Sequence, residues 1–171
     1  MEQLELVNDF GVLIYGLPHF DSHQQVILQK GHQDKGPLAI LGAGTGLGMA
    51  RGLQSEQGLV ALASEGGHRE FAPRNEAEWE LACWLKQDLG VSRLSIERIV
   101  SGTGLGHVAH WLLQKPDAAM HPLRSVAEAW RRNSSNDLPA QVSVAAEGGD
   151  PLMQRALQLW LAVSYTHLRA H

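Results

Sequence analysis

A run of glycines is the part of this sequence whose residue types and spacing most directly suggest chemistry. In ILGAGTGLGMARG, residues 40–52, glycine follows an apolar segment and recurs at Gly42, Gly44, Gly46, Gly48 and Gly52. Glycine loses more conformational freedom on folding than any other residue, so its repeated use indicates a backbone that turns sharply or admits a close neighbour. Backbone N–H groups in such a turn can bind a phosphate. The alternative is a glycine-rich hairpin that only reverses the chain.

Two other short segments carry polar side chains suited to a site. We predict a short buried strand over LELVN, residues 4–8, so that Asn8 is its last residue and Asp9 follows it. Functional residues lie at strand ends in many α/β sheets. An Asn-Asp pair is also common as a turn or a helix cap. Glu65 and His68 flank two glycines that allow a tight loop in which both side chains converge. This pair could begin a metal site, but no third ligand stands out, so we assign no metal.

The elements around the glycine run decide which kind of phosphate loop it could be. PLAILGAG (37–44) predicts a buried strand, and GMARGL (48–53) and LVALA (59–63) flank a polar turn as two short antiparallel strands would. A Walker loop needs a lysine and a following helix, and neither is present. The dinucleotide fingerprint, started at Gly42, requires a glycine where the chain has Leu47. A strand, a glycine turn and a returning strand remain.

Helices are predicted on both sides of these strands. GVLIYGLPHF (11–20) is predicted to be helical until Pro18. NEAEWELACWLKQDLG (75–90) is predicted as a helix capped by Asn75 and stopped by Gly90. Its apolar residues recur at roughly helical spacing: Trp79, Leu81, Ala82, Leu85 and Leu89. Three further helices are predicted over residues 102–115, 125–133 and 151–163, the last with Asp150 at its cap.

Other residues with chemical potential are interpreted as structural. His107 and His110 lie three apart in a predicted helix without an accompanying acid, so we expect them on a solvated face. The pattern H-x-D-x-H at 19–23 lies in a polar loop, where such residues are common. Cys83, near the middle of an amphipathic helix, is expected in or near the core.

Composition limits the classes of partner. The chain has 171 residues and a formal net charge of -4 without a long basic run, which argues against a nucleic-acid binder. Its single cysteine excludes an intrachain disulfide and any multi-cysteine zinc site, and agrees with a reducing compartment. No apolar stretch approaches the ~20 residues of a membrane helix, and the first residues do not resemble a signal peptide. We therefore expect a cytoplasmic protein with no membrane partner.

Four segments in order carry a family resemblance: VNDF (7–10), LGAGTGLG (41–48), SEGGHREFAP (64–73) and ERIVSGTGL (97–105). Together they resemble the bacterial glucokinase family, ATP-dependent hexokinases of the actin-like (ribonuclease H-like) ATPase superfamily, in the branch without a zinc-binding cysteine cluster. The resemblance runs from about residue 4 to about residue 163. It implies an α/β fold, a partial actin-like sugar-kinase fold with a mixed sheet, a hairpin phosphate loop and flanking helices, incomplete at both ends.

The resemblance implies roles around a hexose. Asp9 matches the family's catalytic base, which accepts the proton of the attacking sugar hydroxyl, and Asn8 would bind a neighbouring hydroxyl. Glu65 and His68 match the sugar-binding pair of the family, and a carboxylate with an imidazole supplies the acceptors and donor that such hydroxyls need. Glu97 matches a further hydroxyl-binding carboxylate. Without that match Glu97 would read as an ordinary surface charge.

The resemblance also implies a nucleotide site. Gly42, Gly44, Thr45 and Gly46 match a phosphate-contacting motif, in which the threonine hydroxyl adds a donor to the backbone amides. The cofactors implied are ATP and a Mg²⁺ ion that arrives bound to the nucleotide and keeps most of its waters. The implied reaction is transfer of the γ-phosphoryl group of ATP to the 6-hydroxyl of glucose. The alternatives are a kinase for another hexose and a non-catalytic sugar-binding or regulatory domain.

The chain departs from the family at both ends. Nothing before Leu4 contains the family's first phosphate loop, D-x-G-G-T-N, and the segments expected after residue 163 are absent. We expect 1–20 to be the end of a small N-terminal lobe and hinge, 21–163 the first part of a large C-terminal lobe, and 164–171 (SYTHLRAH) a non-native tail that breaks the last helix. Such a fragment is expected to be inactive and to expose apolar surface. The resemblance leaves room for a homodimer of the full-length protein.

Overall fold

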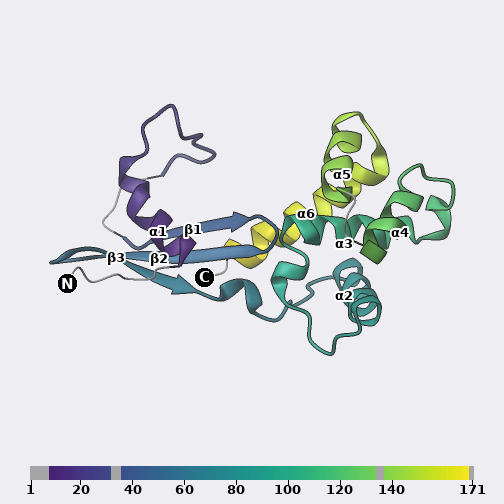
Figure 1. Ribbon diagram of the computed structural model, residues 1–171, viewed down its shortest axis with the longest axis horizontal. Coiled ribbons are helices and arrows are strands. Elements are labelled where there is room, and N and C mark those ends of the chain that lie inside the picture. The colour runs from purple at the N-terminus through teal and green to yellow at the C-terminus, as the bar shows by residue number, and fades with distance from the viewer. Residues whose placement is uncertain (1–7, 32–35, 134–136, 170–171) are drawn as a thin grey trace. The chain divides into compact units, whose positions relative to one another are not determined.

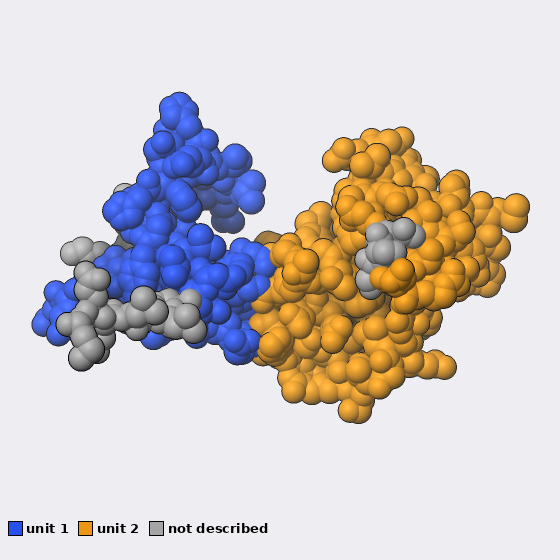
Figure 2. All heavy atoms as spheres, viewed as in Figure 1, with its two compact units in different colours: residues 1–42, 48–66 blue, residues 43–47, 67–171 orange. Residues whose placement is uncertain are grey.

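The structure is a computed structural model that describes residues 8–31, 36–133 and 137–169. Its residues cluster into two compact units (Figure 2). Unit 1 contains residues 1–42 and 48–66, and unit 2 contains residues 43–47 and 67–171. The short turn 43–47 therefore belongs to unit 2 although it joins two strands. The lobe boundaries expected from the sequence stay a prediction.

Unit 1 is built on a three-stranded sheet in the order β1-β2-β3 (Figure 1). The strands are β1 (Leu38–Ala43), β2 (Leu47–Ser55) and β3 (Gly58–Ser64). β2 and β3 are antiparallel, with Ser55 opposite Gly58 at the tight end of the hairpin. The predicted strand, glycine turn and antiparallel hairpin are confirmed, but the predicted burial of the first strand is wrong, because every residue of β1 is half-buried or exposed. The predicted strand 4–8 lies outside the described residues except for Asn8.

One helix covers a face of this sheet. α1 (Asp9–Gly16) continues into a 3-10 turn that contains Pro18, as predicted, and its Ile14 is completely buried. The Phe10 ring lies so close to β1 and β2 that a Cβ at Gly42 would come within 2.6 Å of it, and one at Gly48 within 1.8 Å. Both positions therefore require glycine for packing, whatever else they do.

Apolar side chains are exposed elsewhere in unit 1. Four on the strands are 41–44% exposed: Leu41, Leu53, Val60 and Leu62. Leu53 and Val60 face each other across β2 and β3, and side chains alternate along a strand, so Leu62 shares their face of the hairpin. Whether segments beyond this chain cover these side chains stays a prediction.

Unit 2 is organised around α3 (Gly102–Leu113), which contacts four other helices. These are α2 (Glu76–Leu89), α4 (Arg124–Asn133), α5 (Leu138–Glu147) and α6 (Pro151–Arg169). With partners on all sides, α3 has no solvated face. The prediction of exposed histidines is therefore wrong, because His107 and His110 are only 4% and 5% exposed.

α2 shows both what its sequence pattern fixes and what it does not. Its N-cap Asn75 accepts a hydrogen bond from the Glu78 amide at 2.9 Å, and Gly90 ends the helix at φ 66°, as predicted. The buried stripe is Glu78, Leu81, Ala82 and Leu85. Two positions are corrected, because the stripe is centred one step away from the apolar residues Trp79 and Cys83, which are exposed.

Glu78 can lie in this buried stripe because Arg74, four residues earlier, pairs with its carboxylate. Its carboxylate is completely buried and meets the Arg74 guanidinium, with 2.5 Å between Nη2 and Oε1. The Arg74 amide also donates to Oε2 at 2.9 Å, and the Asn75 side chain donates to Oε1. A buried charge is tolerated when it is paired and hydrogen-bonded in this way.

The remaining helices confirm three predictions and correct two. The helices predicted over 102–115, 125–133 and from 151 onward are present as α3, α4 and α6, and Asp150 caps the last by accepting from Leu152 and Met153 at 3.0 Å. α5 was not predicted. The expectation that the last helix breaks at Ser164 is wrong, since α6 runs to Arg169 and the Ser164 hydroxyl donates to Trp160 O at 2.7 Å. Within the described part of the chain, no helix is long and apolar enough to span a bilayer.

Candidate functional site

The glycine turn of unit 2 is held against the N-terminus of α3. The Gly102 amide donates to Gly44 O at 2.7 Å, and the Thr103 hydroxyl donates to Thr45 O at 3.0 Å. Two successive carbonyls of the turn therefore point toward α3. The first turn of a helix carries unsatisfied N–H donors and the positive end of the helix dipole, so these carbonyls are favourably placed.

Peptide planarity then fixes where the amides of the turn point. In a trans peptide the C=O and the following N–H point in opposite directions, so the amides of Thr45 and Gly46 face away from α3. No residue that the structure describes accepts a hydrogen bond from either amide. A Cβ at Gly44 would meet nothing within 4 Å. The turn therefore presents two N–H donors beside open space, as binding of a phosphate oxygen requires.

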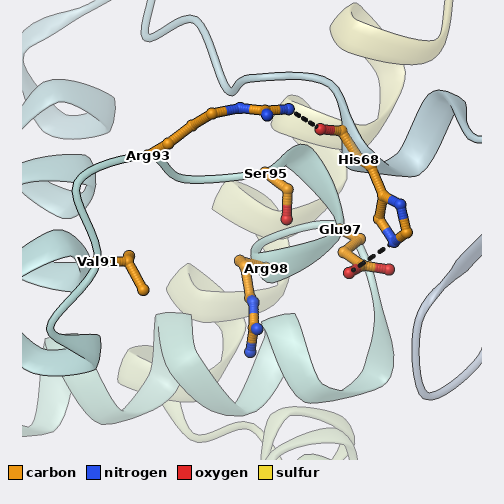
Figure 3. Close-up of a pocket in the computed structure, with 6 residues that line it drawn as sticks. All are labelled: His68, Val91, Arg93, Ser95, Glu97 and Arg98. Carbon is orange, nitrogen blue, oxygen red and sulfur yellow. Dashed lines mark hydrogen bonds and ion pairs between the residues drawn. The ribbon is translucent and has the colours of Figure 1, made fainter.

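His68 and Glu97 are brought together by a short antiparallel pairing. Glu70 pairs with Ser95, and backbone bonds of 2.8 Å on either side join Phe71 N to Leu94 O and Ile96 N to Arg69 O. In an antiparallel pair, stepping two residues back on one strand and two forward on the other reaches another facing pair on the same side. That step places His68 opposite Glu97, whose Oε1 lies 3.4 Å from His68 Nε2 (Figure 3).

Glu97 also reaches the end of the glycine turn. Its second oxygen, Oε2, lies 3.5 Å from the amide nitrogen of Leu47 and would lie 3.0 Å from a Cβ at Gly46. One carboxylate therefore stands between the imidazole of His68 and the turn. Its side chain is 25% exposed, so it remains accessible to solvent.

The turn that carries Glu97 is held by hydrogen bonds from α3 and its N-cap. It lies on a 3-10 turn, Ile96–Arg98, and its carbonyl accepts from the hydroxyl of Ser101, the N-cap of α3, at 2.7 Å. The next carbonyl, Arg98 O, lies 2.9 Å from His107 Nδ1, which must carry the proton and donate. Burial lowers the pKa of His107. A neutral, buried histidine thus helps to hold the turn that carries Glu97.

The loop of His68 packs directly on the glycine turn. A Cβ at Gly67 would lie 2.5 Å from Leu47 O, so only glycine allows this approach. Beside the His68–Glu97 pair is a cavity of about 420 Å³ (Figure 3). Its lining residues are His68, Val91, Arg93, Ser95, Glu97 and Arg98.

The structure brings together in unit 2 His68, Glu97 and the turn with Gly44, Thr45 and Gly46. The other predicted site residues, Asn8, Asp9, Gly42 and Glu65, belong to unit 1. Their assembly with the first group into one site stays a prediction.

Asn8 and Asp9 also have local structural roles. The Asn8 side chain caps α1 by accepting from Gly11 N at 3.2 Å, so the structure realises the cap that the sequence left open. Asp9 is the first residue of that helix, is exposed, and accepts from Phe10 N at 2.9 Å. Glu65 is exposed after β3. Among the described residues, none donates a hydrogen bond to the second carboxylate oxygen of Asp9, which can accept from other partners.

Two residues of unit 2 were not singled out by the sequence. Thr103 contacts the glycine turn, and a signal existed, because Gly-Thr-Gly occurs at 44–46 and again at 102–104. Arg93 donates from Nη2 to His68 O. Nothing in the sequence pattern around Arg93 indicates that contact, which depends on the pairing of two segments far apart in the chain.

Comparison with known proteins decides the family. The glucokinase family model matches residues 1–167. The chain belongs to the glucokinase family. It is 39% identical to the glucokinase of Synechocystis sp. (strain ATCC 27184 / PCC 6803 / Kazusa) in an alignment 168 residues long that covers 93% of this chain and 47% of that protein. It is 36% identical to the glucokinase of Nostoc sp. (strain PCC 7120 / SAG 25.82 / UTEX 2576), over 92% of this chain and 48% of the relative.

Solved glucokinases share the fold. A glucokinase from an Antarctic psychrotroph aligns with a TM-score of 0.69 at 26% identity, covering 90% of this chain and 44% of its own. A glucokinase from Balamuthia mandrillaris in complex with glucose aligns with a TM-score of 0.56 at 25% identity, covering 77% and 35%. The predicted α/β fold and the resemblance to glucokinases are confirmed, and this fold is part of the actin-like sugar-kinase fold. The chain spans about half the length of the curated relatives it matches.

Proposed function

We propose that this chain supplies the hexose-binding and phosphate-binding part of an ATP-dependent glucokinase. The observation that carries the proposal is the position of Glu97. One of its oxygens contacts the imidazole of His68 and the other approaches the Leu47 amide at the end of the glycine turn. Groups suited to sugar hydroxyls are thereby joined through one side chain to backbone donors suited to phosphate.

The hexose would be bound by carboxylate, imidazole and amide groups. Glu97 and His68 offer acceptors and a ring N–H to neighbouring hydroxyls, and Glu65 and Asn8 extend the set. Asp9 would accept the proton of the 6-hydroxyl of the sugar as the oxygen of that hydroxyl attacks the γ-phosphorus of ATP. The bond between the γ-phosphorus and the bridging oxygen breaks, ADP leaves, and the proton resides on the carboxylate of Asp9. Asp9 is exposed, as a base that meets substrate must be.

The nucleotide would be bound by the glycine turn. Gly44, Thr45 and Gly46 offer amides without an acceptor among the described residues, and a Cβ at Gly44 would meet nothing within 4 Å. Donors that are already oriented stabilise the charge that redistributes as the phosphoryl group moves. ATP brings its own Mg²⁺, which neutralises phosphate charge and needs few protein ligands.

The activity is tested in a chimera, because the chain spans about half of its relatives. This chain replaces the matched segment of the Synechocystis glucokinase, and glucose-dependent ADP formation is followed in a coupled assay. We expect turnover of about 1–100 s⁻¹ from the chimera and none from the isolated chain. Asp9→Asn should lower kcat by about 10²–10⁴-fold. A folded chimera without turnover, or an Asp9→Asn variant with normal kcat, would refute the proposal.

The phosphate role is tested by Gly44→Ala. A Cβ there meets no protein atom within 4 Å and the backbone is not left-handed, so the melting temperature should not fall and should rise slightly, because alanine restricts the unfolded chain. If phosphates lie against the turn, the added methyl should raise the KM for ATP about tenfold, as a displaced charge-assisted hydrogen bond does. Gly16→Ala, at another glycine with nothing within 4 Å, is the control. An unchanged KM for ATP in Gly44→Ala contradicts the assignment.

The identity of the sugar is tested in the same chimera. A higher kcat/KM for another hexose than for glucose supports the alternative substrate.

A further inference from the structure

Arg93 extends the pairing that holds the proposed hexose-binding loop. The backbone hydrogen bonds between the segments 69–71 and 94–96 end with Ile96 N donating to Arg69 O. The carbonyl of the preceding residue, His68 O, accepts a hydrogen bond from the Arg93 side chain. In Figure 3 the Arg93 side chain extends toward this carbonyl, and a dashed line joins the two.

Two contacts of His68 bear on the orientation of its ring. Its carbonyl is bound by the guanidinium of Arg93, and its ring lies 3.4 Å from Glu97. A backbone fixed by a charge-assisted bond leaves fewer orientations for the ring. Orientation matters because a hydroxyl is recognised only when donor and acceptor are aligned within hydrogen-bonding geometry.

We propose that Arg93 is a positioning residue for hexose binding, acting through His68 rather than by contact with the sugar. This proposal rests on the proposed function of His68 as a hexose ligand. Removing the guanidinium should free the His68 end of the pairing, so that the ring samples orientations that do not bind the hydroxyl.

Arg98 provides a matched comparison. It lines the same cavity, carries the same charge and is exposed like Arg93. Its guanidinium has no partner among the residues that the structure describes. A general effect of positive charge on the cavity should appear equally when either arginine is removed, whereas a positioning effect should appear only at Arg93.

The experiment uses the full chain with Arg93→Met, Arg93→Lys and Arg98→Met. Glucose affinity is measured by NMR titration, and opening of the pairing by hydrogen exchange at the Ile96 amide. Arg93→Met should weaken glucose binding and speed exchange at Ile96, each about tenfold, because a hydrogen bond to a charged group is lost. Arg93→Lys should recover part of both effects. Arg98→Met should change neither by more than about twofold, and the melting temperatures should agree.

A double-mutant cycle separates positioning from direct contact. In a His68→Gln background the imidazole is already gone, so Arg93→Met should have little further effect on glucose affinity. Fully additive losses would mean that Arg93 binds the sugar itself and would overturn the proposal. Equal losses in Arg93→Met and Arg98→Met, or unchanged exchange at Ile96, would also overturn it. If the unaltered chain binds no glucose, hexose binding by this chain fails, while the exchange measurement still decides whether Arg93 orders the His68 loop.

Discussion

The approach of Gly67 to the glycine turn gives the sharpest test of the site's construction. In Gly67→Ala the new Cβ would lie 2.5 Å from Leu47 O, whereas ordinary contact begins at 3.4 Å. The opposing atom is backbone, so it cannot rotate away. The loop that carries His68 must therefore move by about 0.9 Å relative to the start of β2.

The size of the effect follows from two opposing contributions. Overpacking of this kind destabilises by about 1–3 kcal/mol. Replacing glycine by alanine also restricts the unfolded chain, which returns about 0.4–1 kcal/mol because Gly67 does not have a left-handed backbone. The middle values of the two ranges leave a net loss of about 1.3 kcal/mol, or roughly 3–5 °C in melting temperature for a chain of this size.

The neighbouring glycine is the control. A Cβ at Gly66 would meet Met49 Sδ at 2.7 Å, but a thioether can rotate aside, so Gly66→Ala should change stability by no more than about 0.5 kcal/mol. Both variants are measured by urea denaturation followed by circular dichroism, with the Leu47 amide shift as a local probe. Equal stability of Gly67→Ala and the unaltered chain, or an equal loss in Gly66→Ala, would show that the contact does not constrain the loop.

Three further predictions concern the packing around the site. Burial lowers the pKa of His107 and of His110 below 6.5, so the unfolded chain binds more protons than the folded chain at acid pH. The free energy of unfolding should therefore fall as the pH drops below about 6.5, by at most about 1.4 kcal/mol per pH unit for each histidine. Gly48→Ala places a Cβ 1.8 Å from the Phe10 ring and should destabilise by about 2–3 kcal/mol, but be nearly neutral when Phe10 is already alanine. Arg74→Ala removes the guanidinium that pairs with a completely buried carboxylate and should destabilise by about 3 kcal/mol. Urea denaturation measures all three.

Each of these has a distinct contradictory outcome. Stability that stays constant from about pH 7 to pH 5, or a slope that survives His110→Gln combined with His107→Gln, excludes the buried histidines as its source. A Gly48→Ala loss that persists without the Phe10 ring places the clash elsewhere. For the ion pair, Arg132→Ala on the exposed end of α4 is the control, and an equal loss there would mean that overall charge and not pairing is responsible.

Local signals in the sequence were sufficient for most of the elements. The hairpin of β2 and β3, the Asn75 cap and the Gly90 stop all follow from residues within a few positions of each other. α5 was not predicted, although Asp137 caps it by accepting from Ala140 N at 3.3 Å and Pro139 lies in its first turn. Such local signals fix where an element begins and ends because they act through neighbouring backbone groups.

Burial could not be predicted in the same way. A histidine is favourable on a solvated face or in the core, provided that its ring nitrogen has a partner. His107 is buried because Arg98 O accepts from it, and Glu78 is buried because Arg74 pairs with it. Arg74 lies four residues before Glu78, whereas Arg98 lies nine residues before His107. Even for Glu78 the apolar spacing of the sequence predicted that Trp79 would be buried, and Trp79 is exposed. Burial depends on partners that the fold supplies.

The glycine run shows why motif and mechanism must be separated. Gly42 and Gly48 have no side chain because the Phe10 ring occupies that space, whereas Gly46 faces the Glu97 carboxylate. Only Gly44 lies beside open space with amides that have no acceptor among the described residues. Since one residue type serves packing, close approach and ligand access within a single run, its spacing alone could not assign the roles. The phosphate hypothesis therefore depends on the two outward amides after Gly44, and not on the number of glycines.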